Sequence, residues 1–300
     1  MLNVYEQVDA NKRRSAIIIA CFVLFVIAFV WVVGQVLGSD PSMVIFAAIF
    51  SLASSFTSYY WGDKIILTIS GAKPANRDDF FDFYTVAENL ALAAQIPIPK
   101  LYVIKSPAMN AFATGRDPKH AIICTTTGLL EKLDRSELEG VVAHEISHIT
   151  NFDIRVMMIV AVLVGMVTLL SDWLMRMLWY RGGEREERKQ GNALVMLVGI
   201  ITLIVSPLIA KLIQLAISRR RESLADASAV KMTRFPQGLI SALEKLATSN
   251  IPLVSANQAT AHLYIINPFK GMKKGFHSFA ILFATHPPIE DRIAVLKKML

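Results

Sequence analysis

Two histidines and a glutamate lie together near the middle of the chain, in the run His144-Glu145-Ile146-Ser147-His148. Histidines at this spacing project from one face of a helix, so both imidazoles can bind one metal ion, typically zinc. Glu145 comes directly after the first histidine and reaches a water molecule beside the metal rather than the metal itself. A carboxylate at that position can act as a general base, so the spacing predicts metal-assisted hydrolysis.

A simpler interpretation of this run is a surface helix that carries two solvated histidines. The residues around it argue against that interpretation, because they are apolar: Val141, Val142 and Ala143 precede the run, and Ile146 and Ile149 interleave it. A helix with this pattern is mostly buried, and buried histidines need polar partners. The sequence therefore favours a metal site.

A catalytic zinc ion takes three protein ligands and keeps a fourth position open. The segment 221–227 supplies the acids Glu222 and Asp226, which lie four residues apart on one helix face. Glu222 can act as the third ligand, while Asp226 can hold the second nitrogen of a ligand imidazole. The alternative is that both acids neutralise the basic run 219–221, but the upstream histidines favour ligation.

The composition is that of a membrane protein. Hydrophobic residues make up 54% of the chain and charged residues 18%, with a mean hydropathy of +0.46, whereas soluble domains carry about 25% charged residues. The apolar residues gather in runs long enough to cross a bilayer. The predicted spans are 15–38, 42–61, 156–175 and 193–217. The third and fourth have short uninterrupted cores, so a pair of buried core helices or a re-entrant hairpin remains an alternative.

Lysines and arginines at the ends of these runs predict the orientation, with both chain termini in the cytoplasm. Residues 1–14 then form a cytoplasmic N-terminus, and 176–192 form a charged external loop. The segments 62–155 and 218–300 together make one cytoplasmic catalytic domain, which a membrane hairpin interrupts. The net charge of +7 is explained by these topology anchors, so nucleic acid is not an expected partner, whereas the lipid bilayer is.

The soluble segments are expected to be mainly α-helical with a small β-sheet. Apolar patterns predict strands at 100–104, 111–115 and 121–125. Helical periodicity predicts helices at about 76–94, 219–232, 236–248 and 289–299. The run Ser136-Glu137-Leu138-Glu139 has the pattern of a capping box, which predicts that the helix carrying the two histidines begins there.

The complete set of motifs resembles the HtpX family. The set is His144-Glu-x-x-His148, then Glu222-x-x-x-Asp226 beyond a membrane hairpin, then Thr285-His286-Pro287-Pro288 with Arg292. Members of that family are bacterial membrane-bound metallopeptidases of the gluzincin class, and they are related to the CAAX prenyl endopeptidases. The similarity covers essentially the whole chain and implies a zincin-like catalytic domain.

The resemblance implies one zinc ion per chain, held by His144, His148 and Glu222. It further implies that Glu145 is the catalytic acid and base, and that Asp226 orients His144. His286 would lie beside the cleft and stabilise the developing oxyanion. The alternative for His286 is a structural one, in which the His-Pro-Pro run is the turn that starts a helix.

The resemblance also suggests a place for the substrate. Asn110, Ala111, Phe112 and Ala113 resemble the family's edge strand, along which a peptide lies extended. Arg292 would lie beside the same cleft, unless it pairs with Glu290 or Asp291 in its own helix.

The implied activity is that of a zinc endopeptidase in the bacterial cell membrane. Its polypeptide substrates would be misfolded or damaged membrane proteins, as in quality control during stress. One alternative is a processing peptidase dedicated to a single membrane-associated substrate. Another is a zinc-stabilised membrane scaffold without catalysis. The sequence leaves the oligomeric state open.

Overall fold

The structure is a computed structural model in which helices dominate and a small mixed sheet is present. It describes residues 4–37, 42–182, 219–257, 259–271 and 287–300. The predicted fourth span, 193–217, and most of the predicted external loop lie outside the described residues. The expected fold class, mainly α with a small sheet, is confirmed.

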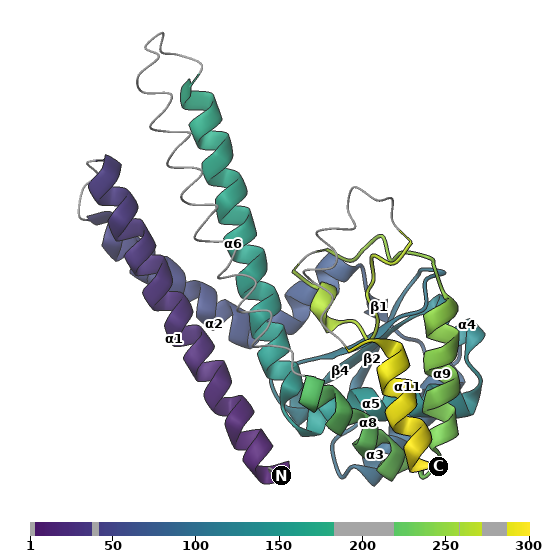
Figure 1. The fold of residues 1–300 in the computed structure, drawn as a ribbon. Helices are drawn as coiled ribbons and strands as arrows, with labels where there is room; N and C mark the ends of the chain where they lie inside the picture. The colour runs from purple at the N-terminus through teal and green to yellow at the C-terminus, as the bar shows by residue number, and fades with distance from the viewer. Residues whose placement is uncertain (1–3, 38–41, 183–218, 258, 272–286) are drawn as a thin grey trace.

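Three long helices form an arm that leads away from a compact body (Figure 1). They are α1 (Val4–Leu37), α2 (Ser42–Ser70) and α6 (Asp153–Gly182). Each pair of these helices is in contact. By length and composition, one helix among the described residues is able to cross a membrane, Val44–Ser70. The helices at 135–150 and 153–169 are bent relative to each other, and they make a second candidate only if the pair is counted as one span.

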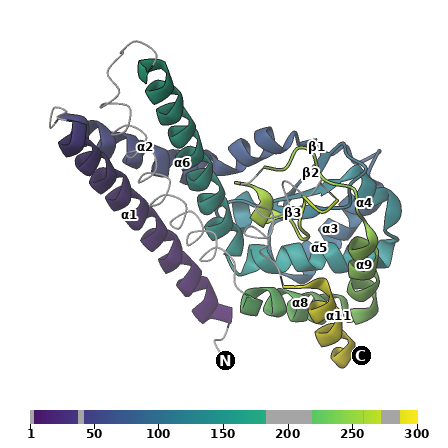
Figure 2. The ribbon, with the colours of Figure 1, turned by 45° about the horizontal axis from the view of Figure 1, so that its top comes forward.

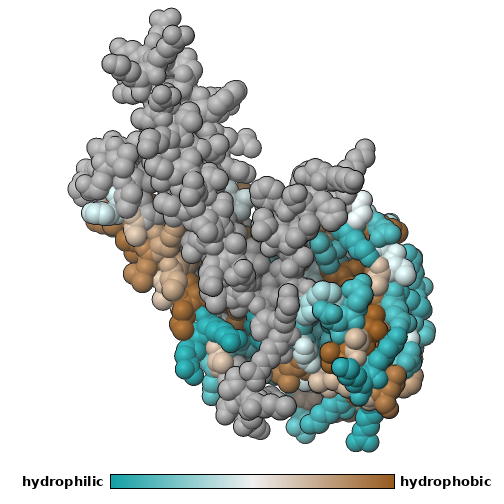
Figure 3. Space-filling view, viewed as in Figure 1, coloured by the Kyte–Doolittle hydropathy of each residue, from teal (hydrophilic) through white to brown (hydrophobic). Residues whose placement is uncertain are grey.

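The arm exposes large apolar side chains to its surroundings. On α1 they include Leu24 and Trp31, and on α2 Phe46 is 73% exposed. Figure 3 shows brown, apolar surface along the arm, while the body is largely teal. A contiguous apolar surface of this kind marks a region that contacts lipid or another protein rather than water.

The sheet lies in the body and, within the described part of the chain, has four strands in the order β1-β2-β4-β3. The strands are β1 (Lys73–Pro74), β2 (Lys100–Ile104), β3 (Ala111–Thr114) and β4 (Ile122–Thr126). β2 and β4 run parallel, and the two outer pairs are antiparallel. The three predicted strands are confirmed, while β1 was not predicted because two residues are too few to show a period.

Helices cover the sheet and surround a central helix, α5 (Figure 2). The body helices are α3 (Phe81–Ala93), α4 (Thr127–Lys132), α5 (Arg135–Thr150), α8 (Arg219–Thr233), α9 (Pro236–Thr248) and α11 (Ile289–Leu296), with short 3-10 turns at 118–120, 261–263 and 297–299. α5 packs against α3, α8, α9 and β3, and its residues from Val141 to Ile149 are buried. This burial on every side excludes the interpretation of a solvated surface helix.

The start of α5 differs from the sequence prediction. Asp134 caps the helix: its side chain accepts from the backbone N–H of Glu137, and the Glu137 carboxylate accepts from the backbone N–H of Asp134. The prediction of a box at Ser136 and Glu139 is therefore wrong by two residues. Aspartate is as good an N-cap as serine, and its carboxylate also interacts favourably with the positive end of the helix.

The chain turns sharply where α5 meets α6. The two helices differ in direction by 83°, and Phe152 between them has a left-handed φ of 60°. A non-glycine residue in this conformation costs energy that the surrounding packing must supply. Because of this turn, α6 leads away from the body as part of the arm. The same turn places Asp153 next to His148.

Candidate active site

Three buried side chains from two helices converge in the body: His144 and His148 from α5, and Glu222 from α8. The Nε2 atoms of the histidines are 3.2 Å apart. Glu222 places its Oε2 3.6 Å from Nε2 of His144 and its Oε1 3.5 Å from Nε2 of His148. The two predicted halves of the site, 74 residues apart at their nearest members in the sequence, therefore meet.

The opposite nitrogens of both imidazoles face carboxylates. Nδ1 of His144 is 2.9 Å from Oδ1 of Asp226, and Nδ1 of His148 is 3.1 Å from Oδ2 of Asp153. An ionised carboxylate can only accept hydrogen bonds, so each one favours the tautomer in which Nδ1 carries the proton and Nε2 bears a lone pair. Two lone pairs and a carboxylate then point into the same small space, and a cation there satisfies all three.

The distances among these ligand atoms fit zinc. Atoms arranged tetrahedrally at about 2.1 Å from a zinc ion are about 3.4 Å from one another. The separations of 3.2, 3.5 and 3.6 Å lie close to that spacing. Two imidazoles and one carboxylate are also a donor set that catalytic zinc sites use.

The charge around the cluster fits a divalent cation as well. Among the residues that the structure describes, the buried charged groups here are Glu145, Asp153, Glu222, Asp226, Arg221 and Arg292. Four carboxylates and two guanidinium groups leave two negative charges when both histidines are neutral. Although burial lowers the pKa of His148, the nearby Asp153, Glu222 and Glu145 outweigh it and raise that pKa to about 9. A metal ion that binds here therefore displaces a proton.

Glu145 lies on α5 between the two histidines in sequence and is 3% exposed. Its charge acts on both His148 and Arg292, which shows that its carboxylate lies within the electrostatic reach of the cluster. A buried carboxylate next in sequence to a candidate metal ligand is a candidate for proton transfer.

Arg292 contacts Asp226 through two hydrogen bonds. Its Nε donates to Oδ2 at 2.9 Å and its Nη2 donates to Oδ1 at 2.6 Å. Burial raises the pKa of Asp226, but Arg292 and His144 outweigh this effect and lower the pKa to about 2. The expected substrate-binding role of Arg292 is not what this placement indicates, because the guanidinium is buried behind His144. It also does not pair with Glu290 or Asp291 in its own helix.

Comparison with known proteins agrees with this geometry. Residues 81–300 match the sequence profile of Peptidase family M48. The chain belongs to this family.

Curated relatives are similar along the whole chain. A protein named Protease HtpX homolog from Caldanaerobacter subterraneus subsp. tengcongensis is 44% identical, over 99% of this chain and 98% of that protein. A protein with the same name from Dictyoglomus thermophilum is 43% identical, over 98% of this chain and 94% of that protein. Another, from Ligilactobacillus salivarius, is 38% identical, over 99% of this chain and 100% of that protein. The predicted resemblance to the HtpX family and the prediction of a metallopeptidase are confirmed.

A solved structure was also found, the crystal structure of S. mikatae Ste24p. It is 19% identical in sequence, with a TM-score of 0.49, and the match covers 98% of this chain and 66% of that chain.

The candidate site includes residues whose role the sequence alone did not indicate. Asp153 was not among the site residues predicted from the sequence, yet it lies against Nδ1 of His148. Arg221 was assigned to membrane topology, yet its Nη1 donates to Oδ1 of Asp153 at 3.0 Å. The spacing of five residues between His148 and Asp153 is the signal that the sequence offers, but the contact depends on the turn at Phe152.

The predicted substrate strand is β3, at the edge of the sheet. Its four residues are buried, and part of its outer edge is paired within the chain. The backbone N–H of Ile265 donates to the carbonyl of Ala111 at 2.9 Å, and the side chain of Asn110 donates to the carbonyl of Ile266 at 3.1 Å. A segment of the chain itself therefore pairs with this part of the edge. His286, the expected oxyanion stabiliser, lies outside the described residues.

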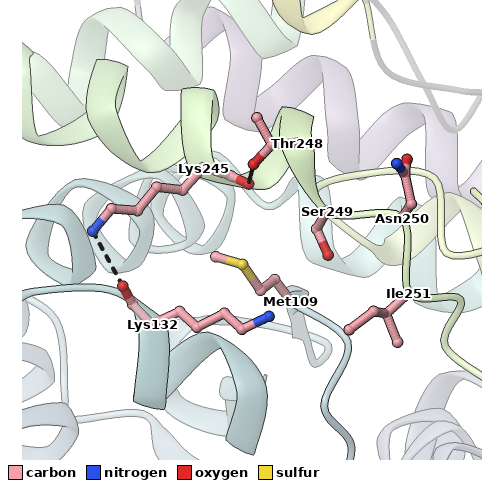
Figure 4. Close-up of a pocket in the computed structure, with 7 residues that line it drawn as sticks. All are labelled: Met109, Lys132, Lys245, Thr248, Ser249, Asn250 and Ile251. Carbon is pink, nitrogen blue, oxygen red and sulfur yellow. Dashed lines mark hydrogen bonds between the residues drawn. The ribbon is translucent and has the colours of Figure 1, made fainter.

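A cavity of about 340 Å³ lies elsewhere in the body, at the end of α9 (Figure 4). It is lined by Met109, Lys132, Lys245, Thr248, Ser249, Asn250 and Ile251. The ammonium of Lys245 donates to the carbonyl of Lys132 and to the carboxylate of Glu137 at 2.6 Å, so that charge is already paired. None of these residues belongs to the cluster of His144, His148 and Glu222, so this cavity is separate from the candidate active site.

Proposed function

We propose that His144, His148 and Glu222 hold one zinc ion and that Glu145 is the general base of peptide hydrolysis. The observation that carries this proposal is the pair of carboxylates, Asp226 and Asp153, behind the two imidazoles. They direct both Nε2 atoms toward Glu222. When bound, zinc supplies a Lewis acid that polarises a carbonyl group and lowers the pKa of water.

The residues of the chain then carry the proton. Glu145 takes a proton from water as the water oxygen bonds to the carbonyl carbon of the scissile peptide. The carbon–nitrogen bond breaks, and Glu145 gives the proton to the leaving amine. Asp226, with Arg292 behind it, keeps His144 in one tautomer and one orientation during these steps.

The test compares Glu145→Gln with Glu139→Gln, which lies on the solvent side of the same helix and pairs with Arg135. Glu145→Gln is expected to lower peptide cleavage by about 10²-fold or more, while the protein still binds one zinc ion. Glu139→Gln should keep both properties. Full activity of Glu145→Gln would overturn the proposed role of this residue.

The arm of α1, α2 and α6 is proposed to lie in the bacterial cell membrane, with the body and both termini in the cytoplasm. The start of α1 and the C-terminus lie at the same end of the molecule, away from the tip of the arm (Figure 1). Aromatic rings and arginines meet where the arm joins the body: Arg155 lies over Tyr59 and Phe152, and Arg116 lies over Tyr60. Such belts are typical of the membrane–water interface.

Single cysteines test this orientation in a Cys21→Ala background. A membrane-impermeant maleimide should label Glu184→Cys in intact cells, because residues 176–192 are proposed to be external. Asp79→Cys, which lies in the body, should be labelled only after the membrane is permeabilised. Labelling of Asp79→Cys in intact cells would contradict a cytoplasmic catalytic domain.

The substrates are proposed to be misfolded or damaged membrane proteins, in keeping with the similarity to HtpX proteases. A panel of unrelated membrane proteins, each offered native and unfolded, distinguishes this role from dedicated processing. A quality-control enzyme should cleave many unfolded members and spare the native ones. Cleavage of a single member at one position would favour a processing peptidase instead.

A further inference from the structure

Asn11 belongs to the basic stretch before the first apolar run, yet its side chain is buried in the body, with 1% of its surface exposed. Its Nδ2 donates to the carbonyl of Asn151 at 2.8 Å and to Oδ1 of Asp153 at 2.8 Å. An amide from the start of α1 therefore reaches the turn between α5 and α6.

The orientation of this amide follows from its neighbours. Both groups near Nδ2 are acceptors, a carbonyl and a carboxylate, whereas Oδ1 accepts from Nη1 of Arg14 at 3.2 Å. The reversed amide would set an oxygen against two acceptors and an NH₂ group against a guanidinium. Asn11 is thus a donor to Asp153.

The contacts of Asp153 connect this amide to the metal ligand. Its Oδ1 accepts from Asn11 and from Nη1 of Arg221 at 3.0 Å, which leaves Oδ2 facing Nδ1 of His148 at 3.1 Å. A carboxylate held by two donors on one oxygen has little freedom to rotate. Its second oxygen then fixes the plane of the imidazole.

We propose that Asn11 is a positioning residue for the metal site, acting on His148 through Asp153. The first helix of the arm is then part of the catalytic apparatus as well as a membrane anchor. Any movement of α1 relative to α6 changes the geometry of a metal ligand. This inference rests on the proposed zinc site, and its test therefore measures zinc binding rather than cleavage.

The test is the zinc affinity of Asn11→Ala, measured with the detergent-purified full chain against a chelator of known affinity. Loss of a residue that hydrogen-bonds to a metal ligand lowers metal affinity by about 10- to 100-fold. A loss of about tenfold is expected here, because Asn11 contacts His148 only through Asp153. The matched control is Ser15→Ala, one turn along α1. Ser15 is also buried, but its hydroxyl donates to the carbonyl of Asn11 in the same helix, so the affinity should be unchanged.

A double variant shows whether Asn11 acts through Asp153. If it does, Asn11→Ala combined with Asp153→Asn should bind zinc no more weakly than Asp153→Asn alone, because the connection is already broken. Additive losses would overturn the proposal, as would an Asn11→Ala protein that binds zinc as tightly as the wild type.

If Asn11→Ala does not fold, Asn11→Ser takes its place. A serine here can bond within the helix, as Ser15 does, but is too short to reach Asp153. The rise in melting temperature on adding zinc should be smaller in this variant than in the wild type. An equal rise with a lower starting temperature would mean that Asn11 is only structural. Failure of the wild type to bind zinc would instead refute the proposed function.

Discussion

Oδ1 of Asp226 lies 2.9 Å from Nδ1 of His144, and the same carboxylate receives two hydrogen bonds from Arg292. Three elements contribute to this chain of contacts: α5 carries the histidine, α8 the aspartate and α11 the arginine. The last turns of the protein thereby support a ligand that lies near its middle. The stability of the body and the geometry of the proposed zinc site depend on the same ion pair.

Replacing Arg292 with methionine should therefore destabilise the protein and weaken zinc binding together. The change leaves the Asp226 carboxylate buried beside His144 without its counter-ion, which costs about 3–5 kcal/mol. Thermal unfolding and a chelator competition measure the two effects. The control is Lys297→Met, which removes an exposed ion pair with Glu244 and should have little effect. Equal stability of the two variants would contradict the assigned role of Arg292.

Removal of zinc should lower the melting temperature, because a zinc ion held by the three proposed ligands connects α5 to α8. Zinc at about 100 times its dissociation constant adds about 2.7 kcal/mol to the stability. Thermal unfolding with and without a chelator measures the shift in melting temperature. Adding zinc back should reverse that shift. Glu222→Gln should melt at the same temperature in both conditions. A wild-type protein whose melting does not respond to the chelator would contradict this prediction.

The cap of α5 gives a prediction that separates the structure from the sequence pattern. Asp134→Ala should cost about 1 kcal/mol, because the backbone N–H of Glu137 loses its acceptor. Ser136→Ala should cost less, since that hydroxyl only donates to Asp134. Thermal unfolding of both variants decides between the two positions. A larger loss of stability in Ser136→Ala than in Asp134→Ala would instead support the capping box predicted at Ser136.

The packing of α5 against α9 depends on the absence of a side chain at Gly140. A Cβ atom there would lie 2.7 Å from the backbone of Leu239, a contact that neither helix can relieve by a rotamer change. Gly140→Ala should therefore cost about 1–3 kcal/mol. In Gly165→Ala, on α6, the new Cβ meets the Cβ of Ala259 at 3.6 Å, an ordinary contact. Thermal unfolding should show a clear loss for the first variant only.

The sequence by itself determined the groups that make up the proposed site. The period of an α-helix sets the direction of each side chain, so His144 and His148 had to share a face, as did Glu222 and Asp226. Three of the four strands followed from local apolar patterns. The motifs together indicated the family, which the comparisons then confirmed.

Only the tertiary structure decided which charged groups pair. Arg292 contacts Asp226 rather than its helical neighbours, and Asp153 holds His148 because the chain turns at Phe152. The edge of β3 at Ala111 is paired with Ile265, a residue far away in the chain. Asn11 bonds to Asp153 across 142 residues. Local spacing fixes directions along one element, whereas the partner of a buried charge depends on how separate elements pack, which no local pattern records.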